Sequence, residues 1–112
     1  MLNNPDSIIH DILDEGLNDW VPVDRIIGGS RALAASEGSD FRQIASAVIE
    51  KLIRGGLMVP GVIGSSGFEA WAGSTEELVE RVMSECEGLS WAPFGAGCWM
   101  ANTEKGDSAA RA

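Results

Sequence analysis

Residues 40–71 constrain the fold more than any other part of the chain, because they predict a helix followed at once by a β-hairpin. Asp40 is a good N-cap, and Gln43 occupies the position from which a capping box reaches back. Apolar residues follow at helical spacing, and Gly55-Gly56 supplies the stop. We therefore predict a helix over residues 40–55. Its apolar stripe comprises Phe41, Ile44, Ala45, Val48, Ile49, Leu52 and Ile53.

Two short apolar runs after this helix predict the hairpin. Residues 57–59 should form its first strand, which Pro60 and Gly61 are expected to interrupt. Residues 64–67, Gly-Ser-Ser-Gly, predict the turn, and residues 68–71 the second strand. A helix followed by such a hairpin is typical of the second half of a winged helix.

Two further helices are predicted ahead of this segment. Apolar residues spaced by three and four place one stripe on residues 5–20. Pro22 suits the first turn of a second helix, in which Gly28-Gly29 indicates either a kink or a closely packed neighbour. Residues 34–39 are expected to form a loop. The stripe of the first helix comprises Ile9, Ile12, Leu13, Leu17 and Trp20.

The C-terminal third predicts one more helix and a short strand. Ser74 and Glu77 form a capping box, and Gly88 is expected to end the helix that they begin. Residues 97–101 indicate a third strand, and residues 107–112 are small or polar and predict a frayed tail.

Length and composition indicate a single domain that folds without a partner. The chain has 112 residues, of which 45% are hydrophobic and 22% charged, which is ordinary globular usage. We predict one α+β, winged-helix-like domain over residues 1–106, with four helices and a small antiparallel hairpin or three-stranded sheet. The N-terminus lacks the features of a secretory signal, and no apolar run approaches the length of a membrane span, so we expect a cytoplasmic protein.

The net charge conflicts with DNA binding, the usual role of a winged helix. The chain carries a formal charge of -9, which would repel a phosphate backbone. The basic residues of the third helix are only Arg42, Lys51 and Arg54, and Glu50 is spaced to pair with Arg54. Nucleic acid is therefore an unlikely partner, although a DNA-binding transcriptional regulator stays the alternative hypothesis.

The residue pattern favours no catalytic, metal or cofactor site. The glycine series between residues 55 and 67 lacks the lysine of a phosphate-binding loop. His10 is the single histidine, and we expect it on the surface of the first helix. Cys98 lies between Gly97 and Trp99 without a nearby base, and both it and Cys86 are expected to be buried, unreactive thiols. We predict that the protein is not an enzyme.

Acidic residues gather in two predicted helices, and each gathering predicts a negative surface. Fields of one sign steer an oppositely charged partner into fast association. The chain should therefore bind a basic protein, and we expect an exposed tryptophan to add affinity. The candidate binding residues are Asp11, Asp14, Glu15 and Asp19 in the first helix and Glu76, Glu80 and Glu87 in the fourth.

Residues 56–61, 67–71 and 98–106 resemble segments of small bacterial proteins with a winged-helix-like core, and the likeness covers about residues 8 to 106. In size and acidity the chain is also similar to immunity proteins that neutralise the toxins of contact-dependent growth inhibition systems. This resemblance implies an acidic immunity protein or antitoxin that binds a basic toxin domain, such as a nuclease. It transfers no functional residue to this sequence.

Overall fold

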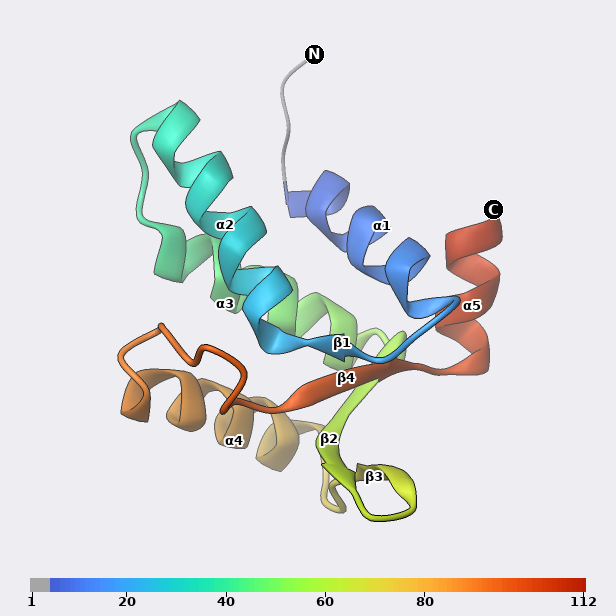
Figure 1. Cartoon of the computed structure of the whole chain (residues 1–112). Coiled ribbons are helices and arrows are strands. Elements are labelled where there is room, and N and C mark those ends of the chain that lie inside the picture. The colour runs from blue at the N-terminus through green and yellow to red at the C-terminus, as the bar shows by residue number, and fades with distance from the viewer. Residues whose placement is uncertain (1–4) are drawn as a thin grey trace.

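Residues 5–112, which the computed structural model describes, form five helices and one four-stranded antiparallel sheet (Figure 1). The predicted α+β class is confirmed. The prediction of four helices and at most three strands is wrong, because a short first strand and a C-terminal helix were not expected. The helices are α1 (Pro5–Gly16), α2 (Val23–Glu37), α3 (Phe41–Arg54), α4 (Thr75–Gly88) and α5 (Glu104–Arg111), and the strands are β1 (Val21–Pro22), β2 (Met58–Gly64), β3 (Gly67–Ala70) and β4 (Trp99–Asn102).

The last strand lies in the interior of the sheet. The strand order is β1-β4-β2-β3, so β4 pairs with β1 on one side and with β2 on the other. Met100 stands opposite both Val21 and Pro60. The strand predicted at residues 97–101 therefore exists at Trp99–Asn102, where it extends the hairpin through β2 and also joins it to β1.

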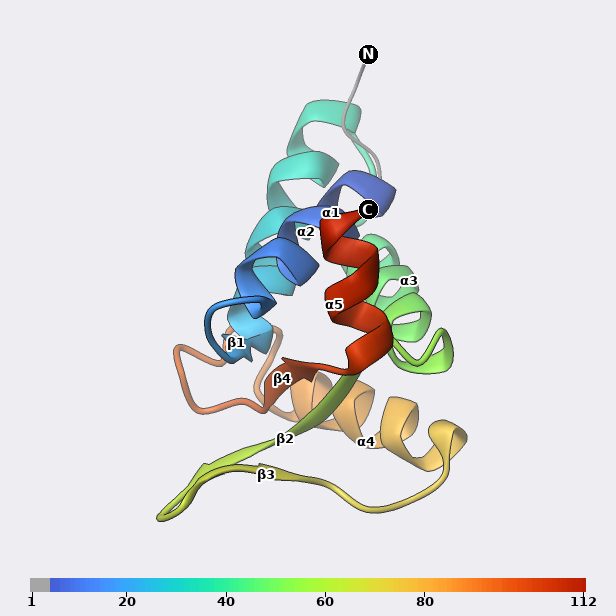
Figure 2. The same cartoon turned by 90° about the vertical axis from the view of Figure 1, so that its right-hand side faces the viewer.

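The two faces of the sheet differ in exposure. Val21, Met58 and Met100 share one face and are buried against the helices. The opposite face, which we call the outer face, carries the partly exposed Val59 and Ala101. Beyond this region β2 and β3 leave the body of the molecule as a projecting hairpin (Figure 2).

Pro60 and Gly61 do not interrupt β2, contrary to the prediction. The carbonyl of Pro60 accepts a hydrogen bond from the Trp71 backbone N–H at 2.9 Å, so Pro60 points its polar backbone atoms away from β4. Its missing N–H therefore removes no hydrogen bond from the β2–β4 ladder. A proline is tolerated here because β3 has already ended at Ala70.

The N-terminal helices differ from their predicted bounds. The first helix ends at Gly16, not Trp20, which leaves the predicted stripe incomplete. The second is continuous through Gly28-Gly29 and runs to Glu37, so most of the predicted loop at residues 34–39 is helical. A side chain at position 29 would lie 3.4 Å from Ile8 of α1, which agrees with the closely packed neighbour predicted there.

The capping signals are largely confirmed. The Asp40 side chain accepts from the Arg42 backbone N–H at 2.9 Å at the start of α3. Ser74 and Glu77 exchange both hydrogen bonds of the capping box at the start of α4. These bonds lower the pKa of the Glu77 carboxyl, because they favour its charged form. Both helices then end at glycine-containing segments, as predicted.

The predicted frayed tail is wrong, because residues 107–112 belong mostly to α5. Thr103 caps this helix by accepting from the Gly106 backbone N–H at 3.1 Å. Ala110 is buried, and α5 packs along α1 (Figure 2). Gly106 lies so close to the carbonyl of Leu57 that a side chain there would collide with it.

This close approach gives a matched pair of glycine substitutions. Gly106→Ala should destabilise the fold by about 1–3 kcal/mol, because the methyl group forces α5 away from β2. Gly28→Ala should stabilise it by about 1 kcal/mol, since the added Cβ meets nothing within 4 Å in a helix interior. Urea unfolding measures both changes. Equal effects of the two substitutions would contradict the docking of α5.

Candidate protein-interaction surface

The four candidate acids near the N-terminus occupy three different environments. Asp11 and Asp14 are exposed on α1 and have no ion-pair partner within residues 5–112. Glu15 is partly buried, and its carboxylate lies 3.4 Å from the guanidinium of Arg25. Asp19 lies beyond the helix and accepts from the Trp20 backbone N–H at 2.8 Å. Asp11 and Asp14 therefore contribute unneutralised charge.

The three candidate acids of α4 form a separate group. Glu76 pairs with Arg54 of α3, and Glu87 accepts from the indole N–H of Trp91 at 3.3 Å. Glu80 is exposed, with no ion pair in the described part of the chain. Helix α4 packs against α3 and lies away from α1 (Figures 1 and 2). The predicted acids thus lie on two separate surfaces.

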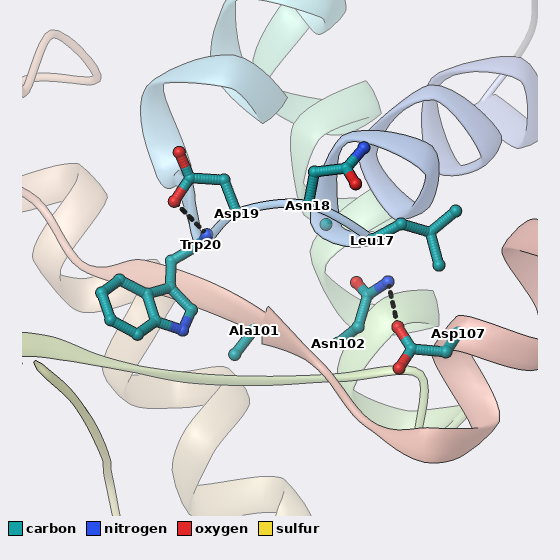
Figure 3. Close-up of a pocket in the computed structure, with 8 residues that line it drawn as sticks. Leu17, Asn18, Asp19, Trp20, Ala101, Asn102 and Asp107 are labelled. Atoms are coloured by element: carbon teal, nitrogen blue, oxygen red, sulfur yellow. Dashed lines mark hydrogen bonds between the residues drawn. The ribbon is translucent and has the colours of Figure 1, made fainter.

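A hollow of about 450 Å³ lies between the α1–β1 connection and the start of α5 (Figure 3). Trp20 stands on one side of this corner hollow and Asp107 on the other, with Ala101 and Asn102 between them. Asp19 turns back toward its own backbone at the rim. The hollow therefore combines an indole ring with carboxylate and amide groups. Its lining comprises Gly16, Leu17, Asn18, Asp19, Trp20, Ala101, Asn102 and Asp107.

Trp20 is the aromatic wall of the corner hollow. Sequence analysis placed it on the apolar stripe of the first helix, but it lies outside that helix and is 41% exposed. Its ring stacks on Phe68 of β3, with 6.1 Å between ring centroids. A side chain at Gly67 would lie 3.3 Å from the indole, and Gly67 has a φ of 113°, which favours glycine. The hairpin thus supports an aromatic side chain that solvent still reaches.

Asn102 holds the other wall together, and nothing in the sequence pattern indicated this role. Its amide donates to the carbonyl of Leu13 at 2.9 Å and to the carboxylate of Asp107 at 3.0 Å. It therefore ties β4 to α1 and α5 at once. Only the fold brings these three segments together, so no short-range signal identifies the residue.

A second hollow, of about 310 Å³, runs between α1 and α2, and we call it the α1–α2 groove. Asp11, Glu15 and Asp24 bring three carboxylates to it, against the single cation of Arg25. Gly28 and Gly29 add no side chain to the α2 wall, on which Asp24 and Arg25 stand. The acidic face of α1 is therefore flanked by two hollows, each of which carries carboxylates.

The two cysteines and the single histidine of the described residues lie in opposite environments, because the thiols are buried and the imidazole is exposed. Cys86 and Cys98 are both buried and unpaired, as predicted. Burial raises the pKa of the Cys86 thiol to about 11 and raises that of Cys98 further, so both stay protonated at neutral pH. His10 is exposed on α1, also as predicted. Within residues 5–112 no group of three or more histidine, cysteine or acidic side chains has the geometry of a metal site.

The chain matches no family model, no curated protein and no solved structure in the comparisons. The resemblance to immunity proteins therefore stays a prediction. Among the described residues, none of the helices combines the length and apolar character needed to cross a bilayer.

The bridging role of Asn102 is tested by an isosteric change. Asn102→Asp removes the amide donor and adds a charge beside Asp107, so we expect a loss of about 1–3 kcal/mol in the free energy of unfolding. Asn18→Asp introduces the same group at an exposed position of the same hollow and should stay within about 0.5 kcal/mol. Denaturant titration of both variants compares them, and similar stabilities would exclude the bridge.

Proposed function

We propose that this chain is an acidic immunity protein or antitoxin, which neutralises a basic bacterial toxin domain, such as a nuclease, by binding it through the acidic face of α1 and the corner hollow. The observation that carries this proposal is that α1 bears unneutralised carboxylates and that the connection directly after α1 exposes an aromatic side chain. Asp11 and Asp14 supply the charge, and Trp20 supplies the aromatic group.

Electrostatics and burial have different roles in this binding. The charge of -9 draws a cationic domain toward the chain and accelerates encounter. Charged residues at the rim of an interface add little affinity once the complex has formed, whereas a tryptophan at its centre often contributes much of the affinity. Trp20 is suited to that role because Phe68 already fixes its ring, so little side-chain entropy is lost on binding. The second acidic group, on α4, is the competing binding face.

The order α1-β1-α2-α3-β2-β3 supports a winged-helix-like core, to which α4, β4 and α5 are added. In such a core α3 would be the DNA-reading helix. Its three cations are already occupied, since Arg42 pairs with Asp40, Lys51 with Asp6 and Arg54 with Glu50 and Glu76. This pairing favours a protein partner over a nucleic acid.

Charge reversal separates the two acidic faces. Asp11→Lys with Asp14→Lys should slow association with the toxin domain roughly tenfold or more at low salt, because it inverts the field at the encounter surface. The probe is the C-terminal domain of the large toxin that, on this proposal, the preceding gene encodes, and its association is measured by stopped-flow fluorescence. The melting temperature should stay nearly unchanged, since both residues are exposed.

The comparison variant is Glu37→Lys with Glu80→Lys, which changes the net charge by the same amount on α2 and on the competing α4 face. It should slow association less than about threefold if α1 is the binding face. If both double variants slow association equally, α1 is not the preferred binding face. If the wild-type chain neither binds this domain nor protects cells from it, the proposed function is wrong.

The DNA-binding alternative predicts a different result. We expect no retarded band when the purified chain is mixed with a pool of random duplexes at physiological ionic strength, because its field repels phosphate. A mobility-shift assay followed by sequencing of any bound duplex measures this. Sequence-selective binding that disappears in the Arg42→Ala, Lys51→Ala, Arg54→Ala triple variant would establish the alternative.

A further inference from the structure

The loop between α4 and β4 exposes an aromatic side chain that the fold does not use. Phe94 is 91% exposed, far more than Trp20 or the other large apolar residues described as exposed. The loop projects at the side of the molecule, beside the N-terminal end of α2 (Figure 1). Single exposed apolar residues are common on proteins, so exposure alone assigns no role. The backbone of the loop adds a second and independent observation.

Three residues of this loop have a backbone conformation that side chains disfavour. Ser90, Trp91 and Phe94 have φ values of 56°, 57° and 47°, and they are the only non-glycine residues with positive φ in the described part of the chain. Each such residue costs conformational free energy, and such residues cluster at functional sites. Buried Trp91 recovers its cost by packing edge-on against Phe41. Phe94 recovers nothing of this kind.

The turn at the tip favours a different residue from the one it has. The Ala96 N–H donates to the carbonyl of Pro93 at 2.9 Å, and the two central residues, Phe94 and Gly95, both have positive φ. This is the pattern of a type I′ turn, whose first central position favours asparagine, aspartate or glycine. A phenylalanine there works against the local conformation and exposes an apolar ring. Folding therefore does not explain this residue.

Three hydrogen bonds to two helices, α2 and α4, hold the loop in place. The Gly95 N–H donates to the Asp24 carboxylate at 3.1 Å, and Arg31 donates to the carbonyl of Trp91 at 3.0 Å. On the far side, the Cys98 N–H donates to Glu85 at 2.6 Å. Phe94 thus stands on a preorganised support, which lowers the entropy lost when a partner binds.

The base of the loop adjoins the acidic side of the molecule. A hollow of about 220 Å³ beside Phe94 is lined by Asp24 and Gly28, and both residues also line the α1–α2 groove. The second carboxylate oxygen of Asp24 is buried and has no hydrogen-bond partner. One carboxylate of the groove, that of Asp24, therefore lies beside the exposed aromatic ring, and through it the hollow at Phe94 adjoins the groove.

We infer that Phe94 is an anchor that inserts into an apolar pocket on a basic protein, while cations of that protein face the α1–α2 groove. This inference rests on the proposed function for the class of partner but not for the binding role of Phe94. The charge of -9 opposes an anionic bilayer and a nucleic acid, and it opposes a second copy of the chain for the same reason. A cationic protein is the occupant that both the ring and the carboxylates fit.

Replacement of Phe94 by a residue that suits the turn separates binding from folding. Phe94→Asn keeps positive φ at low cost, so the melting temperature should stay equal or rise. Affinity for the partner should fall roughly 10- to 100-fold, as expected for an aromatic anchor. Ile63→Asn, at another exposed apolar position on the hairpin, should change affinity less than about threefold.

The partner is identified by photo-crosslinking in the source cells. The full chain carries a benzophenone amino acid in place of Phe94 or, as the control, of Ile63, and each adduct is identified by mass spectrometry. A basic protein crosslinked only from position 94, whose purified form binds the Phe94→Asn variant roughly tenfold or more weakly than the wild type, supports the inference.

Other outcomes overturn the inference. These are an adduct with lipid or with a second copy of the chain, equal adducts from both positions, no adduct, or unchanged affinity of Phe94→Asn. The proposed function fails separately. Suppose that the identified partner is not a toxin, that its affinity falls in Phe94→Asn, and that charge reversal at Asp11 and Asp14 leaves its association unchanged. The binding role of Phe94 would then stand, and the proposed immunity function would be wrong.

Discussion

The insertion of β4 between β1 and β2 is the constraint on which the rest of the structure depends. Met100 stands opposite both Val21 and Pro60, so one buried residue joins the first third of the chain, its middle and its C-terminus. Strand β4 is the neighbour with which β1 pairs in the sheet. Without this pairing the two residues of β1 would form no stable strand. The same insertion places Asn102 against α1 and brings Thr103 to the backbone of Leu57, from which α5 begins. The corner hollow exists only because these segments meet.

Elements whose signals lie within a few residues were predictable. Asp40 and Ser74 cap their helices through bonds to backbone groups two or three positions away, and these bonds form whatever the rest of the chain does. The turn at residues 64–67 and the glycine stop after α3 are local in the same sense. Such signals placed α3, α4 and the hairpin turn to within a few residues, although β2 runs on through Pro60 and Gly61 to Gly64.

Features that depend on distant partners were not predictable. Strand β1 has two residues and no sequence periodicity. Helix α5 contains Gly106, which is required only because the carbonyl of Leu57 lies too close for a side chain. Trp20 falls at helical spacing, yet α1 ends at Gly16, and Phe68 of the hairpin then receives the indole. The surroundings of individual acidic side chains were not predictable either. The sequence shows how many acids the chain has, but only the fold shows that Glu15 faces an arginine while Asp11 does not.

One short connection sets the geometry of both candidate anchors. Trp20 precedes β1 and closes the corner hollow, while Asp24, four positions later at the start of α2, accepts the bond that steadies the Phe94 loop. Strand pairing fixes the residues between them, since Val21 and Pro22 are held by β4. The two aromatic groups are therefore positioned by the same rigid element, so a partner that meets one finds the other at a fixed separation. Such fixed spacing favours binding of a folded surface over capture of a flexible peptide, because a rigid partner loses less conformational entropy when it contacts both.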